Sequence, residues 1–342
     1  MKPVTKINIT KIAQLAGVSK ATVSRVLNDA SCVTAETRDR VLEVIREYDY
    51  IPSAAARGLS TSISKEAAVI FPDLENPFFL AALKGITKVA DRNGYQIMIF
   101  NSDERSEKEH DLLRELKGNK PAGLIMTPVN SNEEHTAQIL KQYEKDGMPI
   151  ILFDRSMEDH EFSMVCAEDE QGAYDAVCRL IEEGHTRIGY LAGDGRVSPI
   201  WGRTGGYRRA LSEHGIPVRE ELMMQCDQKS ETAYRKMKDL MEQDEPPTAI
   251  FSSNNMMTLG CLRYLTEHGK TIGRDIALIG FDDIAILNML NYPISVVTRS
   301  DEHMGELAME MLLRKIRNEE AVTEQETVPT QLILRGSEKY PH

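Results

Sequence analysis

The feature that most constrains the fold is an alternation of short apolar runs and longer amphipathic segments, which begins at Ala67. The apolar runs, which we expect to be strands, are Ala67–Phe71, Gln96–Phe100, Gly123–Thr127, Ile150–Phe153, Arg187–Ala192, Ala249–Ser252 and Ala277–Phe281. The amphipathic segments, which we expect to be helices, are Phe78–Asn93, Ser106–Lys117, Glu133–Asp146, Gln171–Glu183, Gly202–His214, Glu231–Gln243 and Met256–His268. This alternation is typical of parallel sheets flanked by helices, so we predict an α/β fold.

The region from Ala67 to the end of the 342-residue chain is long for a single sheet. We therefore predict two similar α/β lobes. Ligands of open α/β sheets usually bind beyond the carboxyl ends of the strands, so the sequence places a ligand site in the cleft between the lobes.

A different pattern precedes the alternation. Asn8 can cap a helix with apolar residues at helical spacing, Gly17 ends that helix, and Ser19 can cap a second helix over Lys20–Asn28. A third helix is expected to start near Thr34. Helix, glycine-containing turn and helix form a helix-turn-helix, whose second helix enters the DNA major groove.

The charges support this interpretation. Residues 1–65 carry 10 Lys+Arg and 6 Asp+Glu, a balance of +4. The rest carries 31 and 47, a balance of −16 within the total of −12. A basic head on an acidic body suits a polyanion that contacts the head alone.

The second helix of the head would offer DNA six side chains: Lys20, Ala21, Thr22, Ser24, Arg25 and Asn28. Arg25 can donate two hydrogen bonds to guanine O6 and N7, whereas Thr22 and Ser24 suit phosphate oxygens. The alternative is a solvated helical face on a small bundle.

Several classes of protein are disfavoured. No run approaches the ~18 apolar residues of a membrane span, and the N-terminus lacks the apolar region of a secretory signal, so we expect a cytoplasmic protein. Five widely spaced cysteines without a C-x-x-C motif argue against a disulfide framework or zinc site. A phosphate-binding loop, a zinc-protease motif and a G-x-S-x-G motif are missing from the sequence, so we expect neither enzymatic activity nor a cofactor nor a metal.

The sequence resembles the lactose-repressor/galactose-repressor family of bacterial transcription regulators. The resemblance is carried by the residues 16–28, 34–41, 50–59, 71–79, 183–188, 247–251 and 279–283. It implies an all-α helix-turn-helix headpiece followed by a two-lobed effector domain similar to type I periplasmic binding proteins. It also implies a hinge helix over Ser53–Ser60, with Ala56 and Leu59 facing the minor groove, where an inserted leucine can bend DNA.

The same resemblance implies an effector site in the lobe cleft. The candidate residues are Phe78, Phe79, Asp103, Asp154, Arg155, Trp201, Arg203, Asn254 and Asp282. Core packing is the alternative for the two phenylalanines, helix capping for Asp282, and an ion pair across the cleft for Arg203. One residue departs from the family: Asn255 stands where an aspartate is common, so ligand specificity or local hydrogen bonding is expected to differ.

These inferences divide the chain into a headpiece (1–52), a hinge helix and linker (53–66) and an effector-binding and dimerisation domain (67–342). We expect the lobes to comprise about 67–162 with 292–322, and 163–291 with 323–342. The predicted function is a ligand-responsive repressor of carbohydrate-metabolism genes that binds a palindromic operator as a homodimer. Its effector would be a sugar, a sugar acid or a sugar phosphate. The alternative is a sugar receptor without a DNA function.

Overall fold

The computed structural model describes the chain except for residues 1–7, 28–31, 49, 51–63, 319–321 and 340–342. It divides into two compact units, Met1–Ser64 and Lys65–His342. The first unit contains α1 (Ile9–Ala16), α2 (Lys20–Leu27) and α3 (Ala35–Glu47), which pack around Ile12, Val23 and Val41. The predicted hinge helix over Ser53–Ser60 lies outside the described residues.

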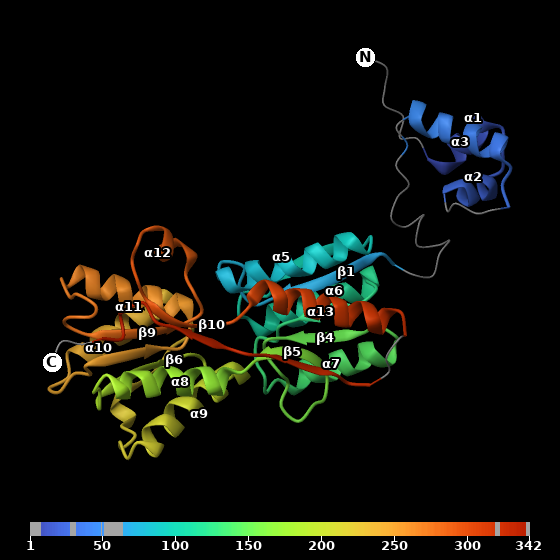
Figure 1. The fold of residues 1–342 in the computed structure, drawn as a ribbon. Coiled ribbons are helices and arrows are strands. Elements are labelled where there is room, and N and C mark those ends of the chain that lie inside the picture. Colours follow the sequence, from blue (N-terminus) through green and yellow to red (C-terminus); the bar gives the residue numbers. More distant parts are fainter. Residues whose placement is uncertain (1–7, 28–31, 49, 51–63, 319–321, 340–342) are drawn as a thin grey trace. The chain divides into compact units, whose positions relative to one another are not determined.

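The second unit consists of two α/β lobes, as predicted (Figure 1). Its elements in chain order are β1 (Glu66–Phe71), α5 (Pro77–Arg92), β2 (Gln96–Asn101), α6 (Ser106–Asn119), β3 (Leu124–Met126), α7 (Glu134–Lys145), β4 (Ile150–Phe153), β5 (Ser163–Ala167), α8 (Asp169–Glu182), β6 (Ile188–Ala192), α9 (Ser198–Glu213), the 3-10 helix η1 (Glu220–Leu222), β7 (Met223–Gln225), α10 (Ser230–Met241), β8 (Ala249–Ser252), α11 (Asn255–Glu267), β9 (Ala277–Phe281), α12 (Ala285–Met289), β10 (Ser295–Thr298), α13 (Asp301–Ile316), β11 (Gln325–Val328) and β12 (Gln331–Ile333).

Each lobe is built on a six-stranded sheet. The first sheet has the order β11-β5-β4-β3-β1-β2 and is parallel throughout. The second has the order β12-β10-β9-β8-β6-β7 and is parallel except for the antiparallel pair β10–β12. Because parallel strands run in the same direction, the carboxyl ends of the strands lie at one edge of each sheet, with the exception of the antiparallel β12.

The alternation of side chains along each strand explains why both faces of each sheet are covered. Val69 and Phe71 of β1 pack against α5 and α13, whereas Ala68 and Ile70 pack against α6 and α7. In the second lobe, α8 and α9 cover one face, and α10 and α11 cover the other. None of the described helices is long and apolar enough to cross a membrane.

The chain passes between the lobes at different residues from those predicted. The strand β5 (163–167) belongs to the first sheet, and β10 (295–298) belongs to the second. The strand β11 (325–328) returns to the first sheet before β12 joins the second. The crossings therefore follow β5, β10 and β11.

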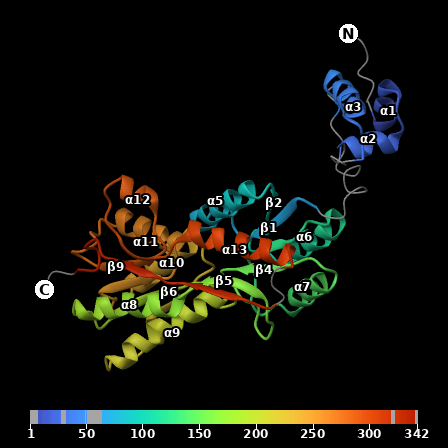
Figure 2. The same ribbon diagram turned by 45° about the vertical axis from the view of Figure 1, so that its right-hand side comes forward.

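The helices α5 and α13 approach each other until their backbones touch. They lie side by side on the first lobe in both views (Figure 1 and Figure 2). A Cβ at Gly85 would lie 1.9 Å from the carbonyl oxygen of Glu302, and one at Gly305 would lie 2.0 Å from that of Ala82. The contact matters for the cleft, because α5 and α13 both begin there.

A buried carboxylate holds the loop after β3. Glu109 of α6 is fully buried, and its oxygens accept hydrogen bonds from Thr136 Oγ1 and the Val129 amide, both at 2.7 Å. Burial raises the pKa of this carboxyl to about 7, although both hydrogen bonds oppose the rise. The loop that Glu109 anchors also supplies the Pro128 carbonyl that binds Arg155 in the cleft.

The helix contact predicts a stability loss for Gly85→Ala. The new methyl group would force the two backbones apart, and overpacking of this kind costs about 1–3 kcal/mol of unfolding free energy. Gly118→Ala in α6 is the matched control, since nothing lies within 4 Å of its added Cβ. The control is expected to gain up to ~1 kcal/mol through helix propensity. Urea unfolding measures both, and an equal response of the two variants would contradict the close contact.

Glu109 predicts a specific pH dependence of stability. Its folded-state pKa is higher than in the unfolded chain, so the native state binds more protons between about pH 4.5 and 7. The unfolding free energy should therefore fall by up to about 3 kcal/mol as the pH rises through this window. Glu109→Gln should remove that part of the dependence, whereas Glu115→Gln, an exposed carboxylate on the same helix, should not. Urea unfolding at pH 5 and pH 7.5 gives the change in unfolding free energy between the two pH values. An equal change in wild type and Glu109→Gln would refute the raised pKa of Glu109.

Candidate functional site

The first helix pair of the headpiece is fixed by three local signals. Asn8 caps α1 by accepting a hydrogen bond from the Lys11 amide at 3.0 Å. Gly17 ends the helix in the left-handed conformation at φ 64°, which glycine adopts without strain. Ser19 then accepts a hydrogen bond from the Thr22 amide at 3.1 Å and so starts α2.

The predicted DNA-contacting residues of α2 divide by exposure. Val23 and Val26 are buried against α1 and α3, which leaves Lys20, Ala21 and Arg25 exposed. Thr22 and Ser24 are half-buried. The remaining predicted residues, Asn28, Ala56 and Leu59, lie outside the described residues. The exposed face of α2 thus carries two cations and little bulk, which suits a groove lined by phosphates.

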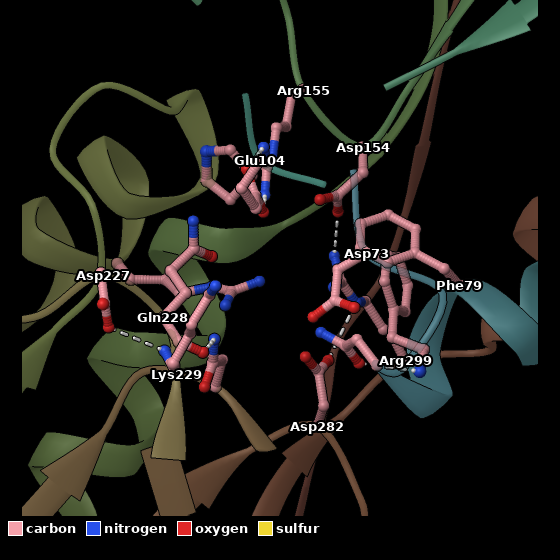
Figure 3. Close-up of a pocket in the computed structure, with 15 residues that line it drawn as sticks. Asp73, Phe79, Glu104, Asp154, Arg155, Asp227, Gln228, Lys229, Asp282 and Arg299 are labelled. Carbon is pink, nitrogen blue, oxygen red and sulfur yellow. Dashed lines mark hydrogen bonds and ion pairs between the residues drawn. The ribbon is translucent and has the colours of Figure 1, made fainter. Parts of the chain in front are cut away.

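The second candidate site is a pocket between the two lobes (Figure 3). Its lining residues are Asp73, Asn76, Phe78, Phe79, Glu104, Asp154, Arg155, Pro199, Arg203, Asp227, Gln228, Lys229, Asn254, Asp282 and Arg299. Most of them follow the carboxyl ends of strands from one lobe or the other. The space enclosed is about 30 Å³, which is room for about two water molecules.

Seven of the nine predicted effector residues are brought together in this lining: Phe78, Phe79, Asp154, Arg155, Arg203, Asn254 and Asp282. Asp103 is outside it, with a side chain 57% exposed and 3.8 Å from Lys108. Trp201 is also outside it, and its indole donates to the Gly195 carbonyl at 2.7 Å.

Eight further lining residues were not predicted from the sequence: Asp73, Asn76, Glu104, Pro199, Asp227, Gln228, Lys229 and Arg299. Glu104 follows Asp103 directly, so the predicted strand end was right but the residue was one position early. Asp227, Gln228 and Lys229 follow β7, a strand of three residues that the sequence pattern does not reveal.

Arg299 is the centre of the charge network in the pocket. Its Nη1 donates to Asp154 at 2.6 Å and its Nε to Asp282 at 3.1 Å, and its side chain is 2% exposed. The guanidinium carbon lies 3.9 Å from the centre of the Phe78 ring, a cation–π contact. Phe78 and Phe79 are themselves 3% exposed and pack with Phe71 and Phe153, so both belong to the core as well as to the lining.

The other two guanidiniums of the lining are paired with carboxylates as well. Arg203 Nε donates to Asp169 at 2.8 Å, Nη1 donates to the Ser253 carbonyl, and the group lies over the Phe281 ring at 3.7 Å. Arg155 forms a bidentate pair with Glu104 at 2.7 and 2.9 Å.

Burial and neighbouring charges shift the acid–base behaviour of this network. Burial raises the pKa of Asp169, against the opposing effect of Arg203 and Arg299. Burial and the neighbouring Asp282 raise the pKa of Asp301 to about 7. Burial acts to lower the pKa of Arg299, but the carboxylates of Asp282, Asp154 and Asp169 outweigh it and raise the pKa. Arg299 therefore remains charged.

Direct hydrogen bonds join the lobes around the pocket. Asn255 Nδ2 in the second lobe donates to Asn76 Oδ1 in the first at 2.9 Å. The Ser131 amide donates to the Arg196 carbonyl at 2.8 Å, and the Ser198 amide donates to Ser131 Oγ at 3.0 Å. The cleft is therefore bounded on several sides by contacts that must break when the lobes separate.

Comparison with known proteins identifies the architecture. The model of the lacI family of bacterial regulatory proteins matches residues 8–53, and that of the periplasmic binding protein-like domain matches residues 177–338. The chain is 32% identical over 335 residues to catabolite control protein A of Priestia megaterium, covering 97% of this chain and 99% of that relative.

Solved structures agree with these matches. The transcriptional regulator CelR–cellobiose complex is similar with a TM-score of 0.74 and 25% identity, over 97% of this chain and 99% of that chain. The lac repressor dimer bound to operator and the anti-inducer ONPF shares the fold, with a TM-score of 0.84 and 24% identity over 98% of this chain and 100% of that chain.

The headpiece match excludes the alternative of a sugar receptor without a DNA function. It also agrees with the expectation that the chain is not an enzyme. The chain belongs to the lacI family of bacterial regulatory proteins, and it is a DNA-binding transcription regulator with a periplasmic-binding-protein-like effector domain.

Proposed function

We propose that this regulator is a cytoplasmic repressor of carbohydrate-metabolism genes, that it binds a pseudo-palindromic operator as a homodimer, and that a sugar-like effector adjusts its affinity for DNA. The proposal is carried by the pocket between the lobes, which combines aromatic rings with paired charged groups. Such a lining suits a ligand with many hydroxyl groups, because carboxylates accept and guanidiniums donate hydrogen bonds. The CelR relative forms a complex with cellobiose, which supports a sugar here.

The charges of the pocket favour an uncharged effector over a sugar acid or a sugar phosphate. The lining contains the carboxylates of Asp73, Glu104, Asp154, Asp227 and Asp282, against four cations. Each of the three guanidiniums is already paired with a carboxylate of the protein. An anionic ligand would have to displace one of these carboxylates and leave it buried without its partner, which is costly.

The proposed homodimer is supported by an apolar surface on the second lobe. Ile286 and Met289 of α12, with Leu290 and Tyr292 after it, are residues exposed by 54%, 76%, 69% and 38%. A contiguous apolar patch is characteristic of an interaction site. A second copy of the chain is the proposed partner, because a two-fold dimer presents two headpieces to the two halves of a palindrome.

Arg25 is proposed to determine part of the operator sequence. Binding to a randomised duplex library, followed by sequencing, would identify the preferred sites of the wild type and of Arg25→Ala. We expect the variant to lose about 1–3 kcal/mol of discrimination at one base pair in each half-site. Lys20→Ala is the matched control, expected to weaken binding to all sequences alike. If Arg25→Ala also weakens all sequences alike, Arg25 contacts phosphate instead.

The effector class is tested by thermal unfolding with sugars of different charge. At 100 times its Kd, a ligand stabilises by about 2.7 kcal/mol, which corresponds to a rise in Tm of roughly 4–5 °C for a chain of this length. We expect such a rise with members of a panel of uncharged monosaccharides and disaccharides, and none with gluconate or glucose 6-phosphate. The fluorescence of Trp201, the single tryptophan of the chain, provides a second readout. A rise confined to the anionic sugars would exclude the proposed class.

A further inference from the structure

Arg299 stands at a junction between the lobes. It follows β10, the last strand that the chain contributes to the second sheet before it crosses, and it precedes α13 of the first lobe. A side chain at this position can reach both lobes without spanning open solvent. Arg299 was not predicted from the sequence, and in the proposed function it enters only as one of three paired guanidiniums that disfavour an anionic ligand.

The partners of Arg299 come from equivalent places in the two lobes. Asp154 directly follows β4 of the first sheet, and Asp282 directly follows β9 of the second. Both residues have a φ of 66°, and their amides donate to Val165 and Val297 respectively, each at 2.8 Å. Phe78 adds the cation–π contact from the first lobe.

We propose that Arg299 is an internal ligand of the cleft: a guanidinium tethered to the crossing segment that binds the strand-end carboxylates of both lobes and holds the lobes together. That this cleft binds an effector rests on the proposed function, whereas the tether between the lobes does not. An external ligand that uses Asp154 and Asp282 must share them with Arg299 or displace it. Arg299 therefore also determines specificity, by favouring ligands that donate hydrogen bonds to carboxylates.

The energetics support a tether rather than an incidental pair. Asp154, Asp282 and Arg299 are all less than a tenth exposed, so water does not replace a lost partner. Breaking a buried pair by removal of one member is strongly destabilising, because the other charge remains buried without compensation. Here the charges left behind would be two carboxylates, one in each lobe, which repel each other.

Hydrogen exchange of the full-length protein tests the tether. The amides of Ser131, Ser156 and Ser198 donate hydrogen bonds between the lobes, so their exchange reports on lobe separation. In Arg299→Ala we expect these amides to exchange at least about tenfold faster, with a fall in Tm on the order of 10 °C. Arg299→Lys keeps the charge without the planar fork, and is expected to fold with a smaller increase in exchange.

Arg335→Ala is the matched control. Arg335 forms a bidentate pair with Asp283 at 2.6 and 2.9 Å, and both residues belong to the second lobe. Its loss should lower the Tm without faster exchange of the three interlobe amides. Unchanged interlobe exchange in Arg299→Ala, or an equal increase in Arg335→Ala, would overturn the proposal.

Chemical rescue supplies an independent test. Methylguanidinium at tens of millimolar should occupy the site left by Arg299→Ala and slow the exchange of the interlobe amides towards the wild-type rate. Sodium chloride at the same concentration should have no comparable effect, because the site binds a planar hydrogen-bond donor and a rise in ionic strength alone does not fill it. An equal response to both salts would show that no guanidinium site exists between the lobes. Neither test involves DNA or a sugar, so either result is independent of the repressor function.

Discussion

The compensation of buried charge is the constraint on which the cleft depends. Two parallel sheets bring the carboxyl ends of their strands to one place, and the aspartates Asp154 and Asp282 follow two of those ends. Burial of such carboxylates without a partner would be costly. Arg299 binds both carboxylates and compensates one of their two charges, and it lies on one of the three segments that connect the lobes.

Much of the fold could be predicted from the sequence, because the central strands are apolar runs and the longer helices are amphipathic. All seven predicted apolar runs overlap a strand, and all seven predicted amphipathic segments overlap a helix. The strands β5, β7, β10, β11 and β12 were not predicted, since each has at least one polar residue among its three to five positions, whereas the equally short β3 and β4 are apolar throughout. The helix α13 was also missed, and with it the details of how the chain crosses between the lobes.

The same limit explains which site residues could be predicted. Asp154 and Asp282 each follow an apolar run that the sequence makes obvious, so their place at a strand end could be inferred. Arg299 follows β10, which was not recognised, and its partners are 145 and 17 residues away along the chain. Pairing over such separations depends on the crossing geometry rather than on any local pattern, so no spacing rule could reveal it.

Contacts in the cleft explain one departure from the family pattern, the asparagine at position 255. Asn76 Oδ1 accepts from the Phe78 amide at 3.0 Å as the cap of α5, which fixes the orientation of its amide group. The same oxygen accepts from Asn255 across the lobes at 2.9 Å, so residue 255 must be a donor there. An aspartate would place a charged acceptor against this oxygen.

The bond between Asn76 and Asn255 also bears on regulation. A net contribution of about 1 kcal/mol is typical of such a bond, and allosteric coupling is typically worth about 1–3 kcal/mol. The free energy of a few such bonds between the lobes is therefore comparable to a typical allosteric coupling free energy. Under the proposed function, an effector therefore has to shift only contacts of this strength, while the Arg299 ion pairs hold the two lobes together.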